Sequence, residues 1–360
     1  MKVKELTVTN YRNIASAHFE PSPGLTVICG KNGHGKTNLL ESVWLLTGSK
    51  SFRSAKDIEL VKENETFALV EGVVQHYEKE DTLRIGIEGE TSERHGRTGS
   101  VNGVTFGRAT NLAGKFTAVV FEPGHLGLIK GSPEKRRRFI DAALCQLYPS
   151  YLTLLRRYTR LVSQKNAVLK RYYETPTAPA LIEIFNKDLA FIGTEISLKR
   201  QNYLEMIRPD VIRNYDNISS GSEKIYFYYQ ASFTDSMLNT FHASLKKDIA
   251  AGFCTTGPHR EDFGIMLDER DAKIYASQGQ QRSIVLALKM AEATGAFRIT
   301  TEYPVMLLDD VLSELDDTRQ EFLLNHMEDK QTIVTACNAA LFTKTNGKIY
   351  RMRSGVLSEE

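Results

Sequence analysis

The sequence predicts an α/β fold in which a mainly helical, basic lobe interrupts a domain built from strands and helices. A short apolar strand at 25–29 leads through a glycine-rich turn into a helix that we place at 36–46. The middle of the chain then has helical patterns, and strand–helix alternation returns in its last third. We therefore expect residues 1–130 and 256–360 to form one domain with a strand-rich subdomain, and residues 131–255 to form the inserted lobe.

Length, net charge and the lengths of apolar runs limit the classes of protein to which this chain can belong. A chain of 360 residues is long enough for two lobes. Its net charge is only +2, so a nucleic-acid-binding surface must arise from local clustering of basic residues. The amino-terminal segment lacks the apolar core of a signal peptide, and no apolar run approaches the ~20 residues that span a bilayer. We therefore expect a cytoplasmic protein without a membrane partner.

The cysteines are spaced for neither a disulfide framework nor a zinc site. None of them forms a CxxC pair, and each lies in an apolar or mixed run. We expect buried, reduced thiols at all four positions, which are Cys29, Cys145, Cys254 and Cys337.

Prolines and apolar periodicity set the expected helices. Ser132 and Pro133 form a helix start, with the Ser132 hydroxyl as the cap, and Pro149 ends that helix. A second helix runs to about residue 173. The same criteria place the remaining elements as helices at about 180–207, 278–299 and 317–327 and strands at 305–308 and 332–336.

The turn after the first apolar strand fits the phosphate-binding pattern GxxxxGK[ST]. Its glycines let backbone N–H groups face phosphate oxygens, and the following helix directs its positive end at the same charge. Lys36 is expected to pair with the β- and γ-phosphates of ATP, and the Thr37 hydroxyl is expected to bind Mg²⁺. The predicted nucleotide contacts of this segment are Gly30, Asn32, Gly33, Gly35, Lys36, Thr37 and Asn38.

The apolar strand at 305–308 ends in two acidic residues, the second element that a phosphate-binding loop requires. Asp309 is expected to hold the Mg²⁺ shell together with Thr37. Asp310 follows directly, where a carboxylate can orient the attacking water. Asp309, Asp310 and Lys36 are therefore the predicted catalytic residues.

A second anion site is predicted where the helix at 278–299 begins. The Ser277 hydroxyl and the free N–H groups of the helix start can bind an anion. Because the phosphate-binding loop already satisfies one triphosphate, this site suggests a γ-phosphate held by another subunit. A plain helix cap without a ligand is the alternative. The predicted contacts are Ser277, Gln278, Gly279 and Gln280.

Together these elements resemble the ABC-type ATPase heads of the SMC group, in which two heads enclose two ATP molecules. The resemblance implies that Ser277–Gln280 act across a dimer and that Ser313–Asp316 also touch the partner head. Within that group the sequence resembles the RecF family, which implies that Arg12 and Asn13 approach the nucleotide. The RecF-like segments, in family order, are Asn10–Asn13, Ser51–Ser54, Pro133–Asp141, Gln164–Asn166, Gly257–Asp262 and Leu307–Asp316.

The sequence departs from other ABC ATPases at three positions. Asp310 stands where glutamate is usual, as it does in RecF, and its shorter reach predicts slow hydrolysis. The switch histidine of transporters has no counterpart in Thr335–Asn338. The glutamine-loop residue is replaced at its nearest candidate position by Glu122, which we take as a third candidate ligand of Mg²⁺.

Basic residues are concentrated at the start of the helical lobe. Residues 130–173 contain eleven lysines and arginines, opposed by Glu134 and Asp141 alone. Such a cluster predicts salt-dependent contacts with the DNA backbone that carry no sequence preference. A solvated helix face is the alternative. The candidate DNA contacts are Lys135, Arg136, Arg137, Arg138, Arg156, Arg157 and Lys165.

The RecF resemblance implies an ATP-gated DNA clamp with slow, Mg²⁺-dependent ATPase activity. An ATP-induced homodimer would hold duplex DNA near single-strand/double-strand junctions and assist the loading of RecA at gaps, with RecR and, indirectly, RecO. The alternative is an SMC-type chromosome-organising ATPase, which needs a coiled coil far longer than this helical lobe provides. A transporter ATPase would need the switch histidine. A GTPase would need an NKxD motif, from which Asn186–Leu189 departs.

Overall fold

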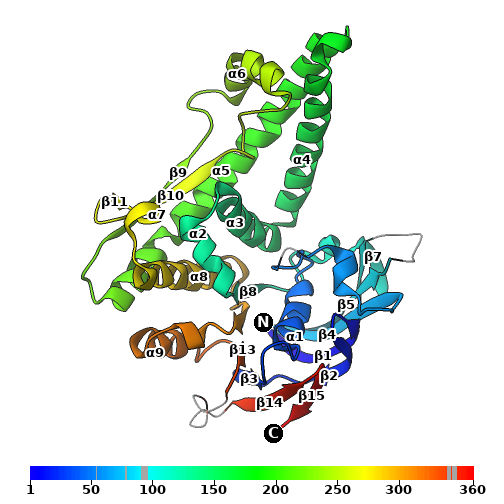
Figure 1. The fold of residues 1–360 in the computed structure, drawn as a ribbon, viewed down its shortest axis with the longest axis vertical. Coiled ribbons are helices and arrows are strands. Elements are labelled where there is room, and N and C mark those ends of the chain that lie inside the picture. Colours follow the sequence, from blue (N-terminus) through cyan, green and yellow to red (C-terminus); the bar gives the residue numbers. More distant parts are fainter. Residues whose placement is uncertain (54, 78, 91–95, 339–341, 343–346) are drawn as a thin grey trace.

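The computed structural model of the chain describes residues 1–53, 55–77, 79–90, 96–338, 342 and 347–360. Its central six-stranded sheet contains β3 (Leu25–Cys29), β8 (Ala118–Phe121), β12 (Val305–Asp309), β13 (Thr332–Ala336), β14 (Lys348–Arg353) and β15 (Val356–Glu359). The order is β15–β14–β3–β13–β12–β8, parallel except for β15 (Figure 1). Because β13 lies between β3 and β12, the carboxyl ends of these three strands meet at one edge, where α/β sheets bind ligands.

A second six-stranded sheet is antiparallel and forms the strand-rich part at the lower right of Figure 1. Its strands are β1 (Lys2–Tyr11), β2 (Ile14–Phe19), β4 (Phe67–His76), β5 (Lys79–Glu88), β6 (Arg97–Val101) and β7 (Val104–Arg108), in the order β2–β1–β4–β5–β6–β7. Helix α1 (Lys36–Leu45) packs between the two sheets, and its Leu39, Leu40 and Val43 are fully buried there. The first turn of α1 is thereby fixed at the edge of the central sheet.

The central sheet separates two hydrophobic cores. Ile28 of β3 packs in the core that contains α1 and the antiparallel sheet. Its neighbours Val27 and Cys29 point to the opposite face and pack with the helices. This alternation along one strand is the period of two that a β-strand imposes, and both faces are apolar because both are covered.

The segment after β8 forms the helical lobe in the upper half of Figure 1. Its helices are α2 (Gly127–Lys130), α3 (Pro133–Leu147), α4 (Pro149–Lys170), α5 (Ala178–Ser219) and α6 (Met237–Ala251). Helices α4 and α5 lie side by side. A three-stranded antiparallel sheet completes the lobe, with β9 (Ile225–Gln230) and β11 (Arg270–Asp271) on either side of β10 (Asp262–Leu267). The chain then continues through α7 (Ala272–Tyr275), α8 (Gln278–Thr300) and α9 (Asp317–Asn325).

The structure confirms the α/β fold but corrects several elements. The helix expected at 180–207 has 42 residues and continues through Pro209. Val211 and Tyr215 beyond that proline are fully buried, and this packing outweighs the helical hydrogen bond that proline removes. Ser132 makes no side-chain capping hydrogen bond to α3. The small sheet of β9–β11 was not predicted.

The prediction that all four cysteines are buried is only partly confirmed. Cys29 and Cys254 are buried and Cys145 is half-buried, but Cys337 is exposed. The apolar run before Cys337 forms the buried strand β13, which ends at Ala336. Cys337 comes directly after the strand, outside the core, and is therefore exposed. In the part of the chain that the structure describes, no helix is both long enough and apolar enough to cross a membrane.

Candidate functional site

The loop between β3 and α1 has a backbone that requires glycine. Gly30, Gly33 and Gly35 have φ values of 156°, 79° and 106°. A Cβ atom at Gly30 would lie 2.3 Å from the carbonyl oxygen of Met352, and one at Gly35 would lie 2.8 Å from Asn13 Oδ1. Side chains at Gly30 and Gly35 would therefore clash with the rest of the protein, whereas the space beside Gly33 is open.

Lys36 lies inside this loop with its charge turned toward backbone oxygens. Its Nζ donates to the carbonyl oxygens of Gly30, at 2.7 Å, and Lys31, at 3.2 Å. The side chain is 6% exposed. A buried ammonium beside the amino end of α1 is a favourable place for a phosphate group.

The acidic pair lies directly opposite the first turn of α1. Asp309 Oδ1 accepts hydrogen bonds from Thr37 Oγ1, at 2.7 Å, and Thr335 Oγ1, at 2.9 Å. Burial raises the pKa of Asp309, although both hydroxyls oppose that shift. Asp310 has a left-handed φ of 52° and donates its N–H to Thr335 Oγ1 at 2.9 Å. Thr335 thus holds both acidic residues at the edge of the sheet.

Glu122 joins this group through the pairing of β8 with β12. Phe121 is opposite Leu308, so Glu122 and Asp309 follow at the same edge. Burial raises the pKa of Glu122 to about 7; Lys289 opposes the rise and the nearby charge of Asp309 adds to it. When they are ionised, these two carboxylates and the Thr37 hydroxyl are oxygen donors of the kind that Mg²⁺ prefers.

The described residues of this site suit a metal ion that takes only some of its ligands from the protein. They contain no cluster of three or more acidic, histidine or cysteine side chains able to hold a metal alone. Mg²⁺ in nucleotide sites is bound by one or two carboxylates, with phosphate oxygens and water completing the shell. Thr37 and Asp309 meet this requirement, and Glu122 is the third candidate.

The structure places Asn13 and Arg12 differently from each other. Asn13 Nδ2 donates to the Gly33 carbonyl at 3.4 Å, and Asn13 Oδ1 accepts from Asn38 Nδ2 at 2.7 Å. Arg12 instead binds Glu41 through Nε and Nη2, at 2.5 and 3.1 Å. Burial opposes the charged guanidinium, but the Glu41 carboxylate outweighs it and raises the pKa of Arg12. Asn13 therefore lines the loop, whereas Arg12, directly after β1, is held by Glu41 of α1.

The segment Ser277–Gln280, which we call the signature segment, begins α8 as predicted. Ser277 Oγ accepts from Gln280 N at 3.2 Å, and Gln280 Oε1 accepts from Ser277 N at 2.7 Å. This reciprocal capping box fixes the helix start. Ser277 and Gln278 are nevertheless exposed. The segment is therefore a helix cap whose first two residues remain accessible to a ligand.

Sequence reasoning missed Thr335 and gave no role to Arg53. A hydroxyl at the end of the strand next to the acidic strand was the available signal for Thr335. Arg53 Nη1 donates to Asn38 Oδ1 at 2.8 Å, which brings an exposed cation to the rim of the loop. It belongs to the RecF-like segment at 51–54, of which Ser54 lies outside the described residues.

The candidate DNA contacts divide by exposure. Lys135 and Arg138 on α3 and Arg157 on α4 are exposed. Arg157 is only loosely paired, with 4.0 Å between its Nη2 and Asp188 Oδ2. Arg137 and Arg156 are half-buried, and Arg137 donates to the Glu261 carbonyl at 2.7 Å. We call the three exposed members, Lys135, Arg138 and Arg157, the basic surface of α3 and α4.

Two candidates are wrong, because their side chains are buried in ion pairs. Arg136 binds both carboxylate oxygens of Asp262 at 2.7 Å and is 5% exposed. Lys165 is fully buried, with its Nζ 3.2 Å from Asp248 Oδ2. Neither side chain presents a surface to a phosphate, and both hold the helical lobe together.

Replacing Arg136 with alanine is expected to destabilise the protein by about 3 kcal/mol, because the change leaves the Asp262 carboxylate without its partner. Urea denaturation would measure the loss. The matched control is Arg157→Ala, which removes an exposed arginine at a 4.0 Å pair and is expected to change stability by less than about 1 kcal/mol. Equal effects of the two changes would show that Arg136 is not an internal anchor.

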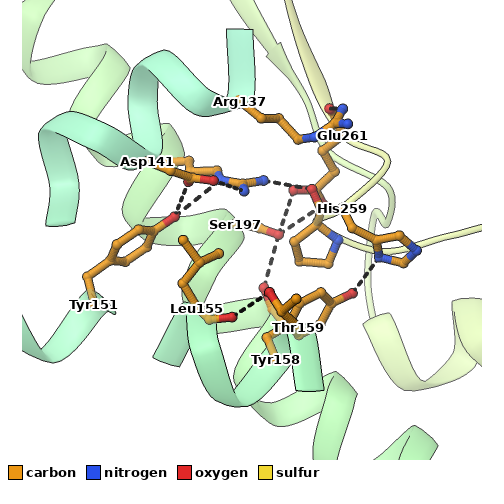
Figure 2. Close-up of polar contacts among 12 residues, drawn as sticks. Arg137, Asp141, Tyr151, Leu155, Tyr158, Thr159, Ser197, His259 and Glu261 are labelled. Carbon is orange, nitrogen blue, oxygen red and sulfur yellow. Dashed lines mark hydrogen bonds and ion pairs between the residues drawn. The ribbon is translucent and has the colours of Figure 1, made fainter. Parts of the chain in front are cut away.

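The RecF-like segment Gly257–Asp262 is a junction of the helical lobe (Figure 2). Glu261 accepts hydrogen bonds from Ser197 Oγ on α5, and Arg137 of α3 reaches its backbone carbonyl. Asp141 of α3 accepts from Tyr151 OH and is bridged to α5 by Arg200, 2.8 Å away. Figure 2 shows these groups converging from three helices on one loop. The basic surface is therefore built on a rigid polar core.

His259 in this loop is held in its neutral form. A backbone carbonyl can only accept, so Nε2 carries the proton toward Cys254 O, at 3.0 Å. Nδ1 accepts from Tyr158 OH at 2.9 Å (Figure 2). Burial lowers the pKa of His259 to about 4 from an ordinary value of 6.5. Protonation would add a second donor opposite the tyrosine hydroxyl.

The free energy of unfolding is therefore expected to fall as the pH drops from about 6.5 to about 4. Over that range His259 binds a proton in the unfolded chain but not in the folded protein. The contribution is roughly 3 kcal/mol. His259→Gln, which keeps a donor and an acceptor but does not titrate, should flatten this part of the stability profile. Parallel profiles of the two proteins, measured by denaturant unfolding at each pH, would contradict the assignment.

Comparison with known protein families and relatives agrees with the geometry of this site. The family described as the RecF/RecN/SMC N terminal domain matches residues 2–357. The DNA replication and repair protein RecF of Heliobacterium modesticaldum is 35% identical over 372 aligned positions, which cover 99% of each chain. The RecF protein of Staphylococcus haemolyticus is 34% identical, again over 99% of each chain.

Solved structures of a RecF protein and of an Smc head resemble this chain in fold. The recombination mediator protein RecF with ATPrS in the RecFOR pathway superposes with a TM-score of 0.91 at 32% identity, over 99% of this chain and 98% of that chain. An Smc head bound to the C-winged helix domain of ScpA gives a TM-score of 0.57 at 17% identity, over 100% of this chain and 97% of that chain, which supports the fold alone. The match along residues 2–357 and the full-length likeness to RecF proteins show that the chain belongs to the RecF family of DNA replication and repair proteins, with the fold of ABC/SMC-type ATPase heads.

Proposed function

We propose that the protein is an ATP-dependent, DNA-binding ATPase of recombinational repair, in which ATP joins two copies and the joined pair holds duplex DNA. The observation that carries this proposal is the contact of Thr37 with Asp309, 2.7 Å apart across 272 residues of sequence. This contact supports the proposal, because Mg²⁺-dependent hydrolysis of a nucleotide needs the phosphate-binding loop and the acidic strand close together.

ATP would lie on the loop, with its phosphates near Lys36 and the backbone N–H groups of Gly33 and Gly35. Asn13, Asn32 and Asn38 surround the same loop. Thr37 and Asp309 would hold Mg²⁺, with Glu122 as a third ligand. Bound Mg²⁺ supplies neutralisation of the charge that develops on the phosphates. The relative solved with ATP supports this choice of nucleotide.

Asp310 would orient the attacking water. Its carboxylate accepts a hydrogen bond from Ser313 Oγ at 3.2 Å, so it is held near the sheet edge by its own loop. An aspartate reaches less far than a glutamate, which supports slow hydrolysis. A slow step would keep the ATP-bound state long enough to act as a switch.

The signature segment would bind the γ-phosphate of the nucleotide held by the second copy. Its exposure at Ser277 and Gln278 supports this role, because a second copy can reach these residues. Gln280 Nε2 also donates to Glu223 Oε1 at 2.5 Å, which ties the segment to the helical lobe. Nucleotide state and the position of that lobe would therefore be linked.

The exposed basic residues of α3 and α4 would contact the DNA backbone. The family implies binding near single-strand/double-strand junctions, action with RecR and indirectly RecO, and help in loading RecA at gaps. The description of one relative as a recombination mediator in the RecFOR pathway supports these partners.

Sedimentation velocity with Mg²⁺ and ATP, ADP or no nucleotide tests the proposal. We expect dimers with ATP and monomers in the other two states, because only ATP provides a γ-phosphate for the signature segment to bind. A monomer in ATP, or a dimer of equal strength in all three states, would overturn the ATP-gated pair.

The basic surface gives a further expected result. Exchanging Lys135, Arg138 and Arg157 for alanine should lower DNA affinity and reduce the slope of log affinity against log salt by about 0.9 for each DNA phosphate that the protein no longer neutralises. The control is Lys79→Ala, an exposed lysine of the strand-rich part. A salt slope equal to that of the unaltered protein would assign DNA binding to another surface.

A further inference from the structure

Helix α7 presents two large apolar side chains to solvent directly before the signature segment. Ile274 is 66% exposed and Tyr275 is 65% exposed. Ser277 and Gln278 are exposed as well, so apolar and polar accessible groups follow one another along the same short stretch. Adjacent exposed apolar side chains beside an accessible polar site are typical of an interaction surface.

This exposure is built into the fold. Ala272 and Ala276, at either end of the turn, are 1% and 5% exposed and anchor it in the core. The Asp271 side chain caps the turn by accepting from Lys273 N at 2.8 Å. The buried side chain of Gln281 donates from Nε2 to the Ala276 carbonyl at 2.7 Å, which joins the turn to α8.

Tyr275 and the signature segment therefore form one rigid unit. Gln281 lies in the first turns of the same helix that Ser277 caps. The backbone that carries Tyr275 is therefore fixed relative to Ser277, two residues later in the chain, before any encounter. Only the side chain of Tyr275 has to become ordered on contact with a partner, which limits the conformational entropy that binding costs.

We propose that Ile274 and Tyr275 are the apolar part of the surface that receives the P-loop of a second copy, and that Tyr275 completes the partner's nucleotide site by covering the bound nucleotide. The inference rests on the proposed function, which directs Ser277 at the partner's γ-phosphate. On the receiving side Lys31, Asn32 and Gly33 are exposed, so a nucleotide on that loop has an open flank. A nucleotide base offers aromatic faces, and a tyrosine ring is a side chain suited to cover one.

Self-association in ATP provides the first test. Tyr275→Ala is expected to weaken ATP-dependent dimerisation about tenfold or more, as removal of a central aromatic side chain does in other interfaces. Tyr275→Phe should dimerise normally. Binding of a fluorescent ATP analogue, measured at protein concentrations too low for dimers, should be unchanged in both variants. Tyr173→Ala, which removes a tyrosine that is 89% exposed in the helical lobe, is the matched control.

Mixing two defective variants tests whether Tyr275 acts in trans. Lys36→Ala removes the nucleotide site of its own copy, and Tyr275→Ala removes the cover that its copy offers to the partner. A mixed pair keeps one complete site, formed by the P-loop of the Tyr275→Ala copy and the signature surface of the Lys36→Ala copy. ATP hydrolysis by the mixture should therefore exceed the sum of the two variants measured alone.

The outcomes separate this inference from the proposed function. If the unaltered protein does not dimerise in ATP, the proposed function itself fails. If it dimerises and Tyr275→Ala dimerises equally well, or if the mixture shows no rise in hydrolysis, only the role of Tyr275 is overturned. A variant that dimerises normally but loses DNA binding would also overturn it, since the exposed pair would then serve DNA.

Discussion

Replacing Lys36 with alanine is expected to abolish the response of the protein to ATP. The Nζ atom is a buried cation whose hydrogen bonds go to the Gly30 and Lys31 carbonyls, so the loop already holds it among the groups that would surround a phosphate. Each hydrogen bond to a charged group is worth roughly 1.5–3 kcal/mol, so ATP affinity should fall at least tenfold. Isothermal titration would measure this loss, and sedimentation would show the accompanying loss of the ATP-induced dimer.

The matched control for this change lies in the same loop. Lys31 is exposed, and Lys31→Ala removes a positive charge one residue after Gly30 without removing the buried ammonium. We expect Lys31→Ala to keep both ATP binding and dimerisation. Normal dimerisation of the Lys36→Ala protein in ATP would contradict the assignment of the nucleotide site.

Replacing Asp310 with asparagine is expected to block hydrolysis while leaving ATP binding in place. The residue has a φ of 52°, a left-handed conformation that asparagine adopts readily, so the backbone should not change. Loss of a positioned carboxylate that handles the attacking water typically costs about 10²–10⁴-fold in rate. The variant should therefore accumulate as an ATP-bound dimer that releases DNA slowly, which single-turnover hydrolysis and DNA dissociation rates would show.

Ser313→Ala is the informative companion to this variant. It removes the hydroxyl that donates to Asp310 Oδ1 at 3.2 Å but keeps the carboxylate, so hydrolysis should fall only partly. Equal hydrolysis by the Asp310→Asn and unaltered proteins would assign the catalytic carboxylate elsewhere, and Glu122 at the same sheet edge would be the next residue to change.

The parts of the site that are local in sequence were predictable. The phosphate-binding loop was predictable from its glycine spacing between an apolar strand and a helix, and the structure shows positive φ at Gly30, Gly33 and Gly35. The acidic pair was predictable because two acidic residues directly follow four apolar residues, which places them where the strand ends. Their meeting through Thr37 and Asp309 follows from parallel strands ending at one edge.

The errors fall on residues whose partners are far away in sequence. Arg136 and Lys165 were counted as surface charges, yet their acidic partners lie 126 and 83 residues further along the chain. A cluster of charges does not show which members turn inward, because that depends on which tertiary partner each one meets. The small sheet was missed for the same reason, since β9 pairs with a strand more than thirty residues later.

Helix α5 shows how packing overrides a local signal. Pro209 marks a helix end by its own chemistry, but the buried Val211 and Tyr215 keep the helix continuous to Ser219. The resulting helix also carries Arg200, which joins α5 to Asp141 of α3. The sequence therefore predicted a helical lobe without predicting how firmly its helices are joined.

Fluorescence anisotropy of a labelled gapped duplex, at one moderate salt concentration, tests the central claim most directly. The protein would be compared in Mg²⁺-ATP, in ADP and without nucleotide, with Lys36→Ala as the reference that cannot respond. The account predicts tight binding in ATP alone and weak binding in the other two states and in the variant. Equal affinity in all three nucleotide states would contradict it, because DNA would then be held by the basic helices without any ATP-dependent pairing of two copies.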